Sequence, residues 1–341
     1  MAINKANSKD FCIITAVGYY YTGSGIIEDL CREFDNCEVL SDYEVRFLQD
    51  PDGISDLQYN LVDNNHRHNT GFAIKRFLRY AKFLDGSVYS KRYQKIFGDQ
   101  FWNITMEYVD SITQLKSKTW WHGDQLQKGK LFYFLDILFG KITVKVVKQR
   151  RSLLEGREYG YYTYLTKNEF LEKTKIYMRE LFSVARKTDR TYLFVNQLVS
   201  PSNVDRYMDY FDSIKVVVVD RDPRDLYIAC REHTGEGVIP VNNVEDFCIW
   251  YRTTRAHREH EQYDHSRCLF VSMEDLITNY DVSIKSVVEF LGLDERCHTA
   301  PKKYFDPSVS VNGTRLVGKY PQYKKDVQFI EDNLPEYLYR W

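Results

Sequence analysis

The chain has 341 residues, of which 47 are Lys or Arg and 48 are Asp or Glu, so its formal net charge is −1. A hydrophobic fraction of 43% is enough for a packed core, which excludes a disordered or collagen-like chain. The balanced charge argues against a nucleic-acid partner, because proteins that bind nucleic acids usually carry a basic excess. At about 150 residues per domain, the length indicates two domains, or one domain with a large insertion.

The N-terminal residues, MAINKANSKDF, contain no apolar segment typical of a secretion signal. No stretch has the roughly 18 consecutive apolar residues of a membrane span. The seven cysteines are odd in number and include no C-x-x-C pair, which argues against a disulfide framework or a cysteine zinc site. We therefore expect a cytoplasmic protein with reduced thiols and no membrane span.

Three short apolar runs are typical of buried parallel strands: Phe11–Val17, Lys215–Val219 and Cys268–Val271. Weaker strand candidates are Glu38–Leu40 and Thr191–Val195. Helix-like segments follow the three strong runs, and alternating strands and helices predict an α/β fold with a parallel sheet of about five strands. Ligands of such sheets bind beyond the carboxyl ends of the strands.

Residues 71–189 have a different pattern, with mostly helical periodicity and many Trp, Tyr, Lys and Arg residues. We interpret this region as a helical insertion into one α/β domain that spans residues 1–341, and as a candidate acceptor-binding or lid region. The expected helices are Ala73–Leu84, Phe101–Lys116, Lys130–Phe139 and Lys167–Arg186.

The first strong strand leads into a glycine-rich loop, Gly18-Tyr-Tyr-Tyr-Thr-Gly-Ser-Gly25, which precedes a helix-like segment. Glycines permit positive φ and close approach of a phosphate, while backbone amides and a helix N-terminus attract anions. An ordinary strand-to-helix turn would have the same composition. A nucleotide triphosphatase would continue with Lys and Ser or Thr, but here Ser24 and Gly25 follow. The loop therefore suits a phosphate-like group without the parts for magnesium-assisted ATP hydrolysis.

Four segments, in order, resemble the sulfotransferases that use 3′-phosphoadenosine 5′-phosphosulfate (PAPS). The loop resembles the family's 5′-phosphosulfate loop, and Tyr43–Phe47 (YEVRF) is similar to a segment of the heparan-sulfate N- and 3-O-sulfotransferases. Lys215–Asp225 resembles the strand and R-[ND]-P-x-D signature that grips the 3′-phosphate. Gly318–Pro321 (GKYP) resembles the heparan-type C-terminal loop. The segments Ser272–Leu276 and Val287–Leu293 add a further match.

The resemblance implies a P-loop-type fold and transfer of a sulfonate group from PAPS to an acceptor hydroxyl, with 3′-phosphoadenosine 5′-phosphate (PAP) as product. It implies Glu44 as catalytic base, with Arg46 orienting Glu44 or contacting the sulfonate, and with Tyr21 donating a neutral hydrogen bond. A glycan is one candidate acceptor, and no metal is expected because a sulfonate carries less charge than a γ-phosphate. The implied donor-binding residues are Tyr21, Thr22, Gly23, Ser24, Gly25, Ile26, Arg221, Arg315, Gly318 and Lys319.

Three positions depart from the family pattern. Tyr21 stands where the family has Lys or Arg, Ala229 stands where it has Ser, and Asn196-Gln197-Leu198 replaces a K-[ST]-P segment. These departures leave two alternatives open: a nucleotide-dependent kinase with a P-loop, or a catalytically impaired relative that binds nucleotide or glycan. From the residues alone, Glu44 also fits an exposed turn, and Asp225 fits a cap or ion pair within its own helix.

Other polar and aromatic groups are less informative. His257, His260 and Glu261 share a helix face within the expected helix Asp246–His260, which we interpret as a solvated face rather than a metal site. His66 and His68 are alternative bases in a polar loop. The segment from Trp120 to His122 and the tyrosines between Tyr159 and Tyr164 are candidates for core packing or for stacking on a sugar.

Overall fold

A computed structural model of the protein describes residues 11–40, 43–86, 92–233 and 237–341. The chain separates into two compact units. The first unit comprises Met1–Asp50, Arg92–Gly98 and Met178–Trp341, and the second comprises Pro51–Lys91 and Asp99–Tyr177. The division into one domain with an insertion at residues 71–189 stays a prediction.

The first unit contains a parallel sheet of five strands in the order β2-β5-β1-β6-β7. β1 runs from Cys12 to Gly18, and its central residues are fully buried because helices and strands cover both faces of this apolar segment. In the register, Val17 lies beside Val218, and Val218 lies beside Phe270. The other strands are β2 (Cys37–Val39), β5 (Tyr192–Phe194), β6 (Ile214–Asp220) and β7 (Cys268–Ser272).

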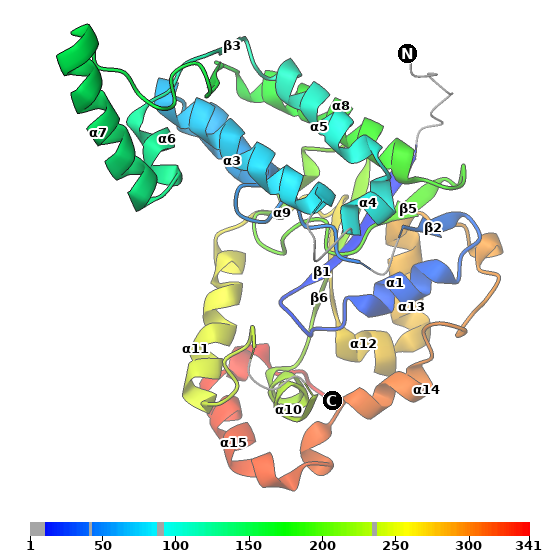
Figure 1. Cartoon of the computed structure of the whole chain (residues 1–341). Helices are drawn as coiled ribbons and strands as arrows, with labels where there is room; N and C mark the ends of the chain where they lie inside the picture. The colour runs from blue at the N-terminus through cyan, green and yellow to red at the C-terminus, as the bar shows by residue number, and fades with distance from the viewer. Residues whose placement is uncertain (1–10, 41–42, 87–91, 234–236) are drawn as a thin grey trace. The chain divides into compact units, whose positions relative to one another are not determined.

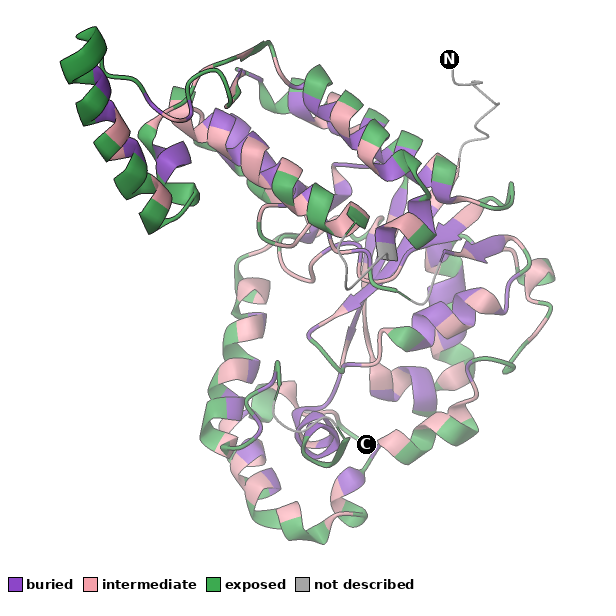
Figure 2. Cartoon of the chain, in the orientation of Figure 1, coloured by how far each residue is buried: buried purple, intermediate pink, exposed green. Residues whose placement is uncertain are grey.

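All five predicted strands are therefore present, and the predicted α/β class with a parallel sheet flanked by helices is confirmed. One hydrophobic core lies between the sheet and the helices α1 (Gly25–Arg32), α12 (Met273–Thr278) and α13 (Tyr280–Leu291). Alternate strand residues such as Ile14 and Val217 supply the sheet side of this core. Figure 2 shows the strands as mostly buried.

A second core cluster joins α10 (Pro223–His233), α11 (Val244–Arg255) and α15 (Lys324–Asn333), as Figure 1 shows. Ala229 is buried in this cluster. Shorter helices complete the first unit: α4 (Arg92–Phe97), α9 (Val204–Met208), α14 (Pro307–Ser310), and the 3-10 turns η2 (Ala256–Glu259), η3 (Glu295–Cys297), η4 (Val311–Gly313), η5 (Leu316–Gly318), η6 (Pro321–Tyr323) and η7 (Pro335–Tyr337).

The second unit is mostly helical, with a two-stranded antiparallel sheet formed by β3 (Leu115–Ser117) and β4 (Gly160–Tyr162). Buried hydroxyl pairs join its helices: Tyr108 bonds Thr174 at 2.9 Å, and Thr105 bonds Tyr177 at 2.8 Å. Its helices are α2 (Ile54–Gln58), η1 (Tyr59–Asp63), α3 (Arg67–Gly86), α5 (Gln100–Ser111), α6 (His122–Gln127), α7 (Lys130–Val147) and the first part of α8 (Lys167–Ala185).

The four expected helices of this region form, but three of their ends were wrong by several residues. The helix expected over Ala73–Leu84 was too short, because α3 begins at Arg67. The segment Phe101–Lys116 was expected to be one helix, whereas α5 ends at Ser111 and Leu115–Ser117 pairs with β4 as a strand. The segment Lys130–Phe139 was too short, because α7 continues to Val147. The helix expected over Asp246–His260 also ends early, since α11 stops at Arg255 and a 3-10 turn follows.

Candidate functional site

The loop between β1 and α1 is closed by one threonine. The Thr22 hydroxyl donates to the Val219 carbonyl at 2.7 Å and accepts the Tyr19 amide at 3.2 Å. A Cβ on Gly18 would lie 2.1 Å from the Thr22 oxygen and 2.9 Å from the Val219 oxygen, so only glycine fits there. The loop therefore packs against the end of β6, and the Thr22 hydroxyl proton is already used.

Positive φ falls on residues that the sequence did not indicate. Tyr20 and Tyr21 have φ of 66° and 57°, and Gly23 has φ of 92°. The left-handed region costs an L-residue roughly 1–2 kcal/mol. Both tyrosine side chains are 48% exposed. The loop thus holds two aromatic rings at its surface in a backbone conformation that glycine would adopt more readily.

Consecutive amides at the end of this loop are available to an anion. Within the described part of the chain, the amides of Gly23, Ser24 and Gly25 have no acceptor, whereas the Ile26 amide donates to the Gly23 carbonyl at 3.0 Å. A helix N-terminus with free amides attracts negative charge. The set of amides that can bind an anion is therefore smaller than the expected Thr22–Ile26, because the Ile26 amide donates within the loop.

Gln197 supports the loop from a neighbouring strand end. Its Nε2 donates to the Ser24 hydroxyl oxygen at 2.9 Å, which leaves the Ser24 proton free to be donated. Gln197 itself has φ of 52°, and Gln49 donates to its carbonyl at 2.7 Å. The neutral Gln197 side chain thus orients the Ser24 hydroxyl.

A cavity of about 810 Å³ opens on this loop. Its lining brings Tyr21, Gly23 and Ser24 together with Glu44 and Arg46. The cavity lies at the carboxyl end of β1, where ligands of parallel sheets bind. Its remaining lining includes Gln49, Gln197, Ser200, Ser202, Val238, Ile239, Thr253, Thr254 and His257.

Glu44 is open to this cavity, with a side chain that is 51% exposed. Arg46 Nη1 lies 3.7 Å from Glu44 Oε2, while Arg46 Nε donates to Asp50 at the shorter distance of 3.0 Å. Burial alone would lower the pKa of Arg46, but Asp50 and, more weakly, Glu44 raise it. Arg46 is therefore held mainly by Asp50 and contacts Glu44 only loosely.

His257 also lines the cavity, although its segment was interpreted as a solvated face. Its Nε2 lies 2.8 Å from the Tyr19 hydroxyl, and its Nδ1 lies 3.1 Å from Glu261. Burial lowers the pKa of His257, with Glu261 partly opposing this effect. The interpretation was wrong for His257 and Glu261 and correct for the exposed Glu259 and His260.

An ionic network anchors Tyr19 and the end of β6. Asp220 accepts from Arg255 and Arg258, each at 2.7 Å, and Arg258 Nε donates to the Tyr19 hydroxyl at 3.0 Å. Burial would raise the pKa of Asp220, but the two guanidinium groups outweigh it and lower the pKa. Charged residues between Asp220 and Arg258 therefore support a loop that lies about 200 or more positions earlier in the chain.

The second group of predicted donor residues meets at one turn. Arg221 Nη2 donates to the Gly313 carbonyl at 2.7 Å, and Lys319 Nζ donates to the Asn312 carbonyl at 2.7 Å. Arg221 Nη1 also lies 3.3 Å from the Tyr21 carbonyl, which connects this turn with the loop. The Arg221 Nε atom is buried and has no partner among the described residues.

The other two predicted donor residues do not join this turn. The Arg315 guanidinium lies 4.7 Å from the centre of the Trp341 ring. A Cβ added to Gly318 would meet no atom within 4 Å outside its chain neighbours. Asp225 accepts the backbone amides of Arg315 and Leu316, each at 2.8 Å. The expectation that Asp225 pairs within its own helix was therefore wrong, because it fixes this late loop instead.

Arg221 lines a smaller cavity of about 230 Å³ together with Glu274. Glu274 Oε1 accepts the Asp222 amide at 2.9 Å, while Oε2 is buried without a partner. Burial raises the pKa of Glu274 to about 7. Arg221 and Glu274, two residues of this lining, thus each carry one buried polar atom that has no partner among the described residues.

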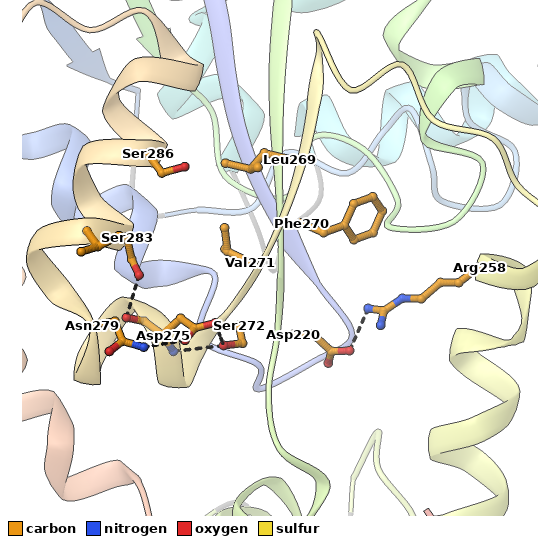
Figure 3. A pocket seen from close by; sticks show the side chains of 11 residues that line it. Asp220, Arg258, Leu269, Phe270, Val271, Ser272, Asp275, Asn279, Ser283 and Ser286 are labelled. Carbon is orange, nitrogen blue, oxygen red and sulfur yellow. Dashed lines mark hydrogen bonds and ion pairs between the residues drawn. The ribbon is translucent and has the colours of Figure 1, made fainter. Parts of the chain in front are cut away.

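A further cavity, of about 730 Å³, lies along β7 and α13 (Figure 3). Its polar side chains are bonded to one another: Asp275 accepts from Ser272 at 3.0 Å and from Asn279 at 2.9 Å, and Asp220 pairs with Arg258. These contacts stabilise the junction of α12 and α13. They leave no converging set of free donors, so this cavity is a weaker candidate for an anionic ligand than the loop cavity.

The aromatic candidates and the alternative bases lie in the second unit. His68 stacks on Trp121 with 4.6 Å between ring centres. Lys116 lies 5.3 Å from the centre of the Tyr159 ring and 5.5 Å from that of Tyr161, which is buried. His68 is therefore packed against an indole, and the hairpin β3–β4 presents a cation among tyrosine rings.

The described residues contain no group of three or more His, Cys, Asp or Glu side chains that could hold a metal ion. Among them, no helix has both the length and the apolar character needed to cross a membrane. All seven cysteines are free thiols.

No protein-family model matches the chain, and no curated protein matches it in sequence. Among solved structures, the chain is similar to retinol dehydratase in complex with androsterone and PAP, with 15% identity and a TM-score of 0.34 over 96% of this chain and 82% of that one. It is also similar to a sulfotransferase of Mycobacterium avium, with 12% identity and a TM-score of 0.37 over 97% and 76% of the two chains. A sulfotransferase of Mycobacterium tuberculosis H37Rv gives 10% identity and a TM-score of 0.34 over 90% and 77%. Similarity at this level fixes no function, which has to come from the residues of the site.

Proposed function

We propose that this protein is a PAPS-dependent sulfotransferase that acts on an acceptor hydroxyl. The observation that carries the proposal is the cavity of about 810 Å³, which unites the free amides of the loop with Glu44 and Arg46. Those elements come from two segments that independently resemble the family's donor loop and catalytic segment. The finer resemblance to the heparan-sulfate enzymes stays a prediction.

The donor-binding residues fit the charges of the nucleotide. Free amides of Gly23, Ser24 and Gly25 suit the 5′-phosphosulfate. Arg221 and Lys319 suit the 3′-phosphate, since their cationic groups converge on Asn312–Gly313 and Arg221 Nε lacks a partner. When bound, PAPS supplies a sulfonate group carried on a phosphate that can leave.

Within this proposal, Glu44 takes the proton of the acceptor hydroxyl. Its exposed carboxylate faces the cavity and can reach an acceptor that the loop has brought close to the sulfonate. The hydroxyl oxygen then forms the new S–O bond while the bond to the leaving phosphate oxygen breaks in line. Arg46, whose Nη1 lies 3.7 Å from Glu44 Oε2, contributes a positive charge that counters charge developing on the sulfonate oxygens.

Tyr21 and Gln197 reduce the positive charge of this cavity. A neutral hydrogen bond is about half as strong as a charge-assisted one, so each substitution weakens stabilisation of the leaving phosphate. Gln197 compensates in part because it orients the Ser24 hydroxyl. We therefore expect slow turnover rather than loss of donor binding.

The cavity lining supports an uncharged, hydroxylated acceptor such as a sugar. Serine, threonine and glutamine side chains border it, and the exposed rings of Tyr20 and Tyr21 offer stacking surfaces. The insertion at residues 71–189 stays a proposed acceptor-binding region, on the basis of the tyrosine and lysine side chains of its β3–β4 hairpin. A cytoplasmic setting, supported by the seven free thiols, is part of the same proposal.

The test begins with binding of PAP, measured by thermal shift. A ligand that binds only the native state stabilises it by RT ln(1 + [L]/Kd), so a concentration of 100 Kd gives about 2.7 kcal/mol. Absence of any shift at millimolar PAP, with the protein folded, would overturn the donor assignment. Stabilisation by ATP that requires magnesium would instead favour a kinase.

The second step separates binding from catalysis. Glu44→Gln should bind PAP like the native protein and lose at least a hundredfold in PAP release from PAPS with a sugar acceptor, because general-base catalysis contributes about 10²–10⁴ in rate. Glu261→Gln, at a carboxylate that contacts the lining residue His257, is the matched control and should retain most of the rate. Equal turnover in Glu44→Gln and the native protein would remove Glu44 as base. Donor binding by the native protein without turnover on any acceptor would favour an impaired relative.

A further inference from the structure

Helix α7 buries its polar residues instead of its apolar ones. Asp136, Gly140 and Thr143 are the buried residues of this 18-residue helix, and their spacing places them on one face. Asp136 accepts from the Ser152 hydroxyl at 2.9 Å, and from the Leu153 amide and the Gln125 side chain. These hydrogen bonds hold α7 to its own unit. Among its apolar side chains, Phe132, Ile137 and Phe139 are half-buried and the others are exposed.

The opposite face of α7 is apolar and exposed. Leu131 is 73% exposed and Phe134 is 58% exposed, and Figure 2 shows most of the helix in the exposed class. Soluble proteins rarely leave contiguous apolar patches of this kind uncovered unless they bind something. On this face the exposed apolar side chains are Leu131, Phe134, Leu135, Leu138, Ile142 and Val146, whereas Tyr133, Val144 and Val147 are exposed nearer the side of Asp136 and Gly140.

We call this exposed apolar face the apolar sector of α7, and lysines line one edge of it. At 100° per residue, Lys130, Lys141 and Lys145 fall within about 60° of one another and beside Phe134 and Leu138. The segment from Lys130 to Arg151 contains six basic residues, all exposed: Lys130, Lys141, Lys145, Lys148, Arg150 and Arg151. Its single acid, Asp136, is buried, so the exposed charge is positive throughout on a chain whose net charge is −1.

We propose that α7 is a membrane-surface helix that docks on a bilayer containing anionic lipids. Helices that lie in the bilayer interface combine an apolar sector with a polar face rich in lysine and arginine. The apolar side chains of α7 would enter the boundary between headgroups and acyl chains, and the lysines at its edge would contact lipid phosphates. This proposal does not depend on the proposed enzymatic activity.

The charge pattern favours lipid over the other occupants of such a face. A second copy of the chain would place two lysine edges against each other with no exposed carboxylate on either helix to pair with them. A transmembrane position is disfavoured because Lys130, Asp136, Lys141 and Lys145 interrupt the apolar sequence, and α7 does not qualify as a span. An anionic bilayer accepts both the apolar sector and the lysines.

The experiment is co-sedimentation of the full chain with vesicles of phosphatidylcholine alone or with 30% phosphatidylserine, a composition chosen as roughly that of a strongly anionic leaflet. We expect the chain to bind the anionic vesicles at least tenfold more tightly than the neutral ones. The variant Lys141→Gln/Lys145→Gln should lose about fivefold in affinity per charge on anionic vesicles, and the difference should shrink in high salt. The variant Phe134→Ser/Leu138→Ser should lose at least tenfold.

The matched control is Ile249→Ser/Val282→Ser, which removes two apolar side chains that are 63% and 76% exposed outside α7. Vesicle binding by this control should equal that of the native chain. Three results would overturn the proposal: no preference for anionic vesicles, a lipid-independent dimer in sedimentation velocity that Phe134→Ser/Leu138→Ser dissociates, or a fall of several degrees in the melting temperature of that variant. The second result would assign the face to another copy, and the third would show that the chain itself covers it.

Discussion

The titration of Glu274 allows the sharpest quantitative prediction. Its side chain is 1% exposed, one of its oxygens has no partner, and burial raises its pKa from the ordinary 4.5 to about 7. A group whose folded pKa lies above its unfolded pKa keeps a proton that the unfolded chain releases. The free energy of unfolding therefore falls as the pH rises from about 4.5 to about 7, and the full loss is present above that range.

The size of the effect follows from the two pKa values. Each pKa unit corresponds to 1.36 kcal/mol, so the difference between 4.5 and about 7 amounts to about 3 kcal/mol. Glu274→Gln keeps an acceptor for the Asp222 amide and removes the ionisation. We expect the variant to match the native protein within about 1 kcal/mol at pH 5 and to be about 3 kcal/mol more stable at pH 8.

Urea unfolding at pH 5, 6, 7 and 8 measures this difference. Other titrating groups contribute equally to both proteins, so the difference between the two curves isolates Glu274. Glu155→Gln, at an exposed carboxylate, is the control and should show no pH-dependent difference. A constant difference between Glu274→Gln and the native protein across this pH range would refute the argument that burial holds the proton.

Two further predictions concern the loop between β1 and α1. Gly18→Ala should lower the free energy of unfolding by about 2–4 kcal/mol in urea unfolding, because its Cβ would break the hydrogen bond from Thr22 to Val219 and overpack the site. Gly25→Ala, with no atom within 4 Å of the added Cβ, should change the stability by less than about 1 kcal/mol, and an equal loss in both variants would contradict the steric argument. Tyr21→Lys should raise kcat for PAP release about tenfold, since a charge-assisted bond to the leaving phosphate replaces a neutral one. An unchanged or lower kcat in Tyr21→Lys, with PAP affinity retained, would show that this position does not face the reacting group.

The strands were predictable because their signal is local. Runs such as Phe11–Val17 and Lys215–Val219 are apolar and bounded by polar residues, and a parallel sheet that is covered on both faces needs such runs. The helix Phe101–Lys116 was predicted too long because periodicity near Leu115 does not reveal the partner strand β4, which lies more than 40 residues away. Pairing of that kind depends on the folded chain.

The candidate site likewise combines residues that the sequence indicates with one that only the folded structure shows. The glycine spacing of the loop, Glu44 and Arg46 are all visible in the sequence, and the structure places them around one cavity. His257 was missed because its position depends on contacts with Tyr19, which lies 238 residues away in the chain. No local pattern distinguishes a histidine that enters a cavity from one on a solvated face.

By itself, the sequence determined the class of fold and the place of the glycine-rich loop after the first strand, and it contained the segments that resemble those of a sulfotransferase. Only the tertiary structure decided which of these groups are free. The Thr22 hydroxyl donates to Val219 in β6, and the Ile26 amide donates within the loop. Gln197 orients Ser24, and the cationic groups of Arg221 and Lys319 meet at one turn. The reason is that composition and spacing follow from local backbone geometry, whereas hydrogen-bond satisfaction and burial depend on segments that are distant in the chain.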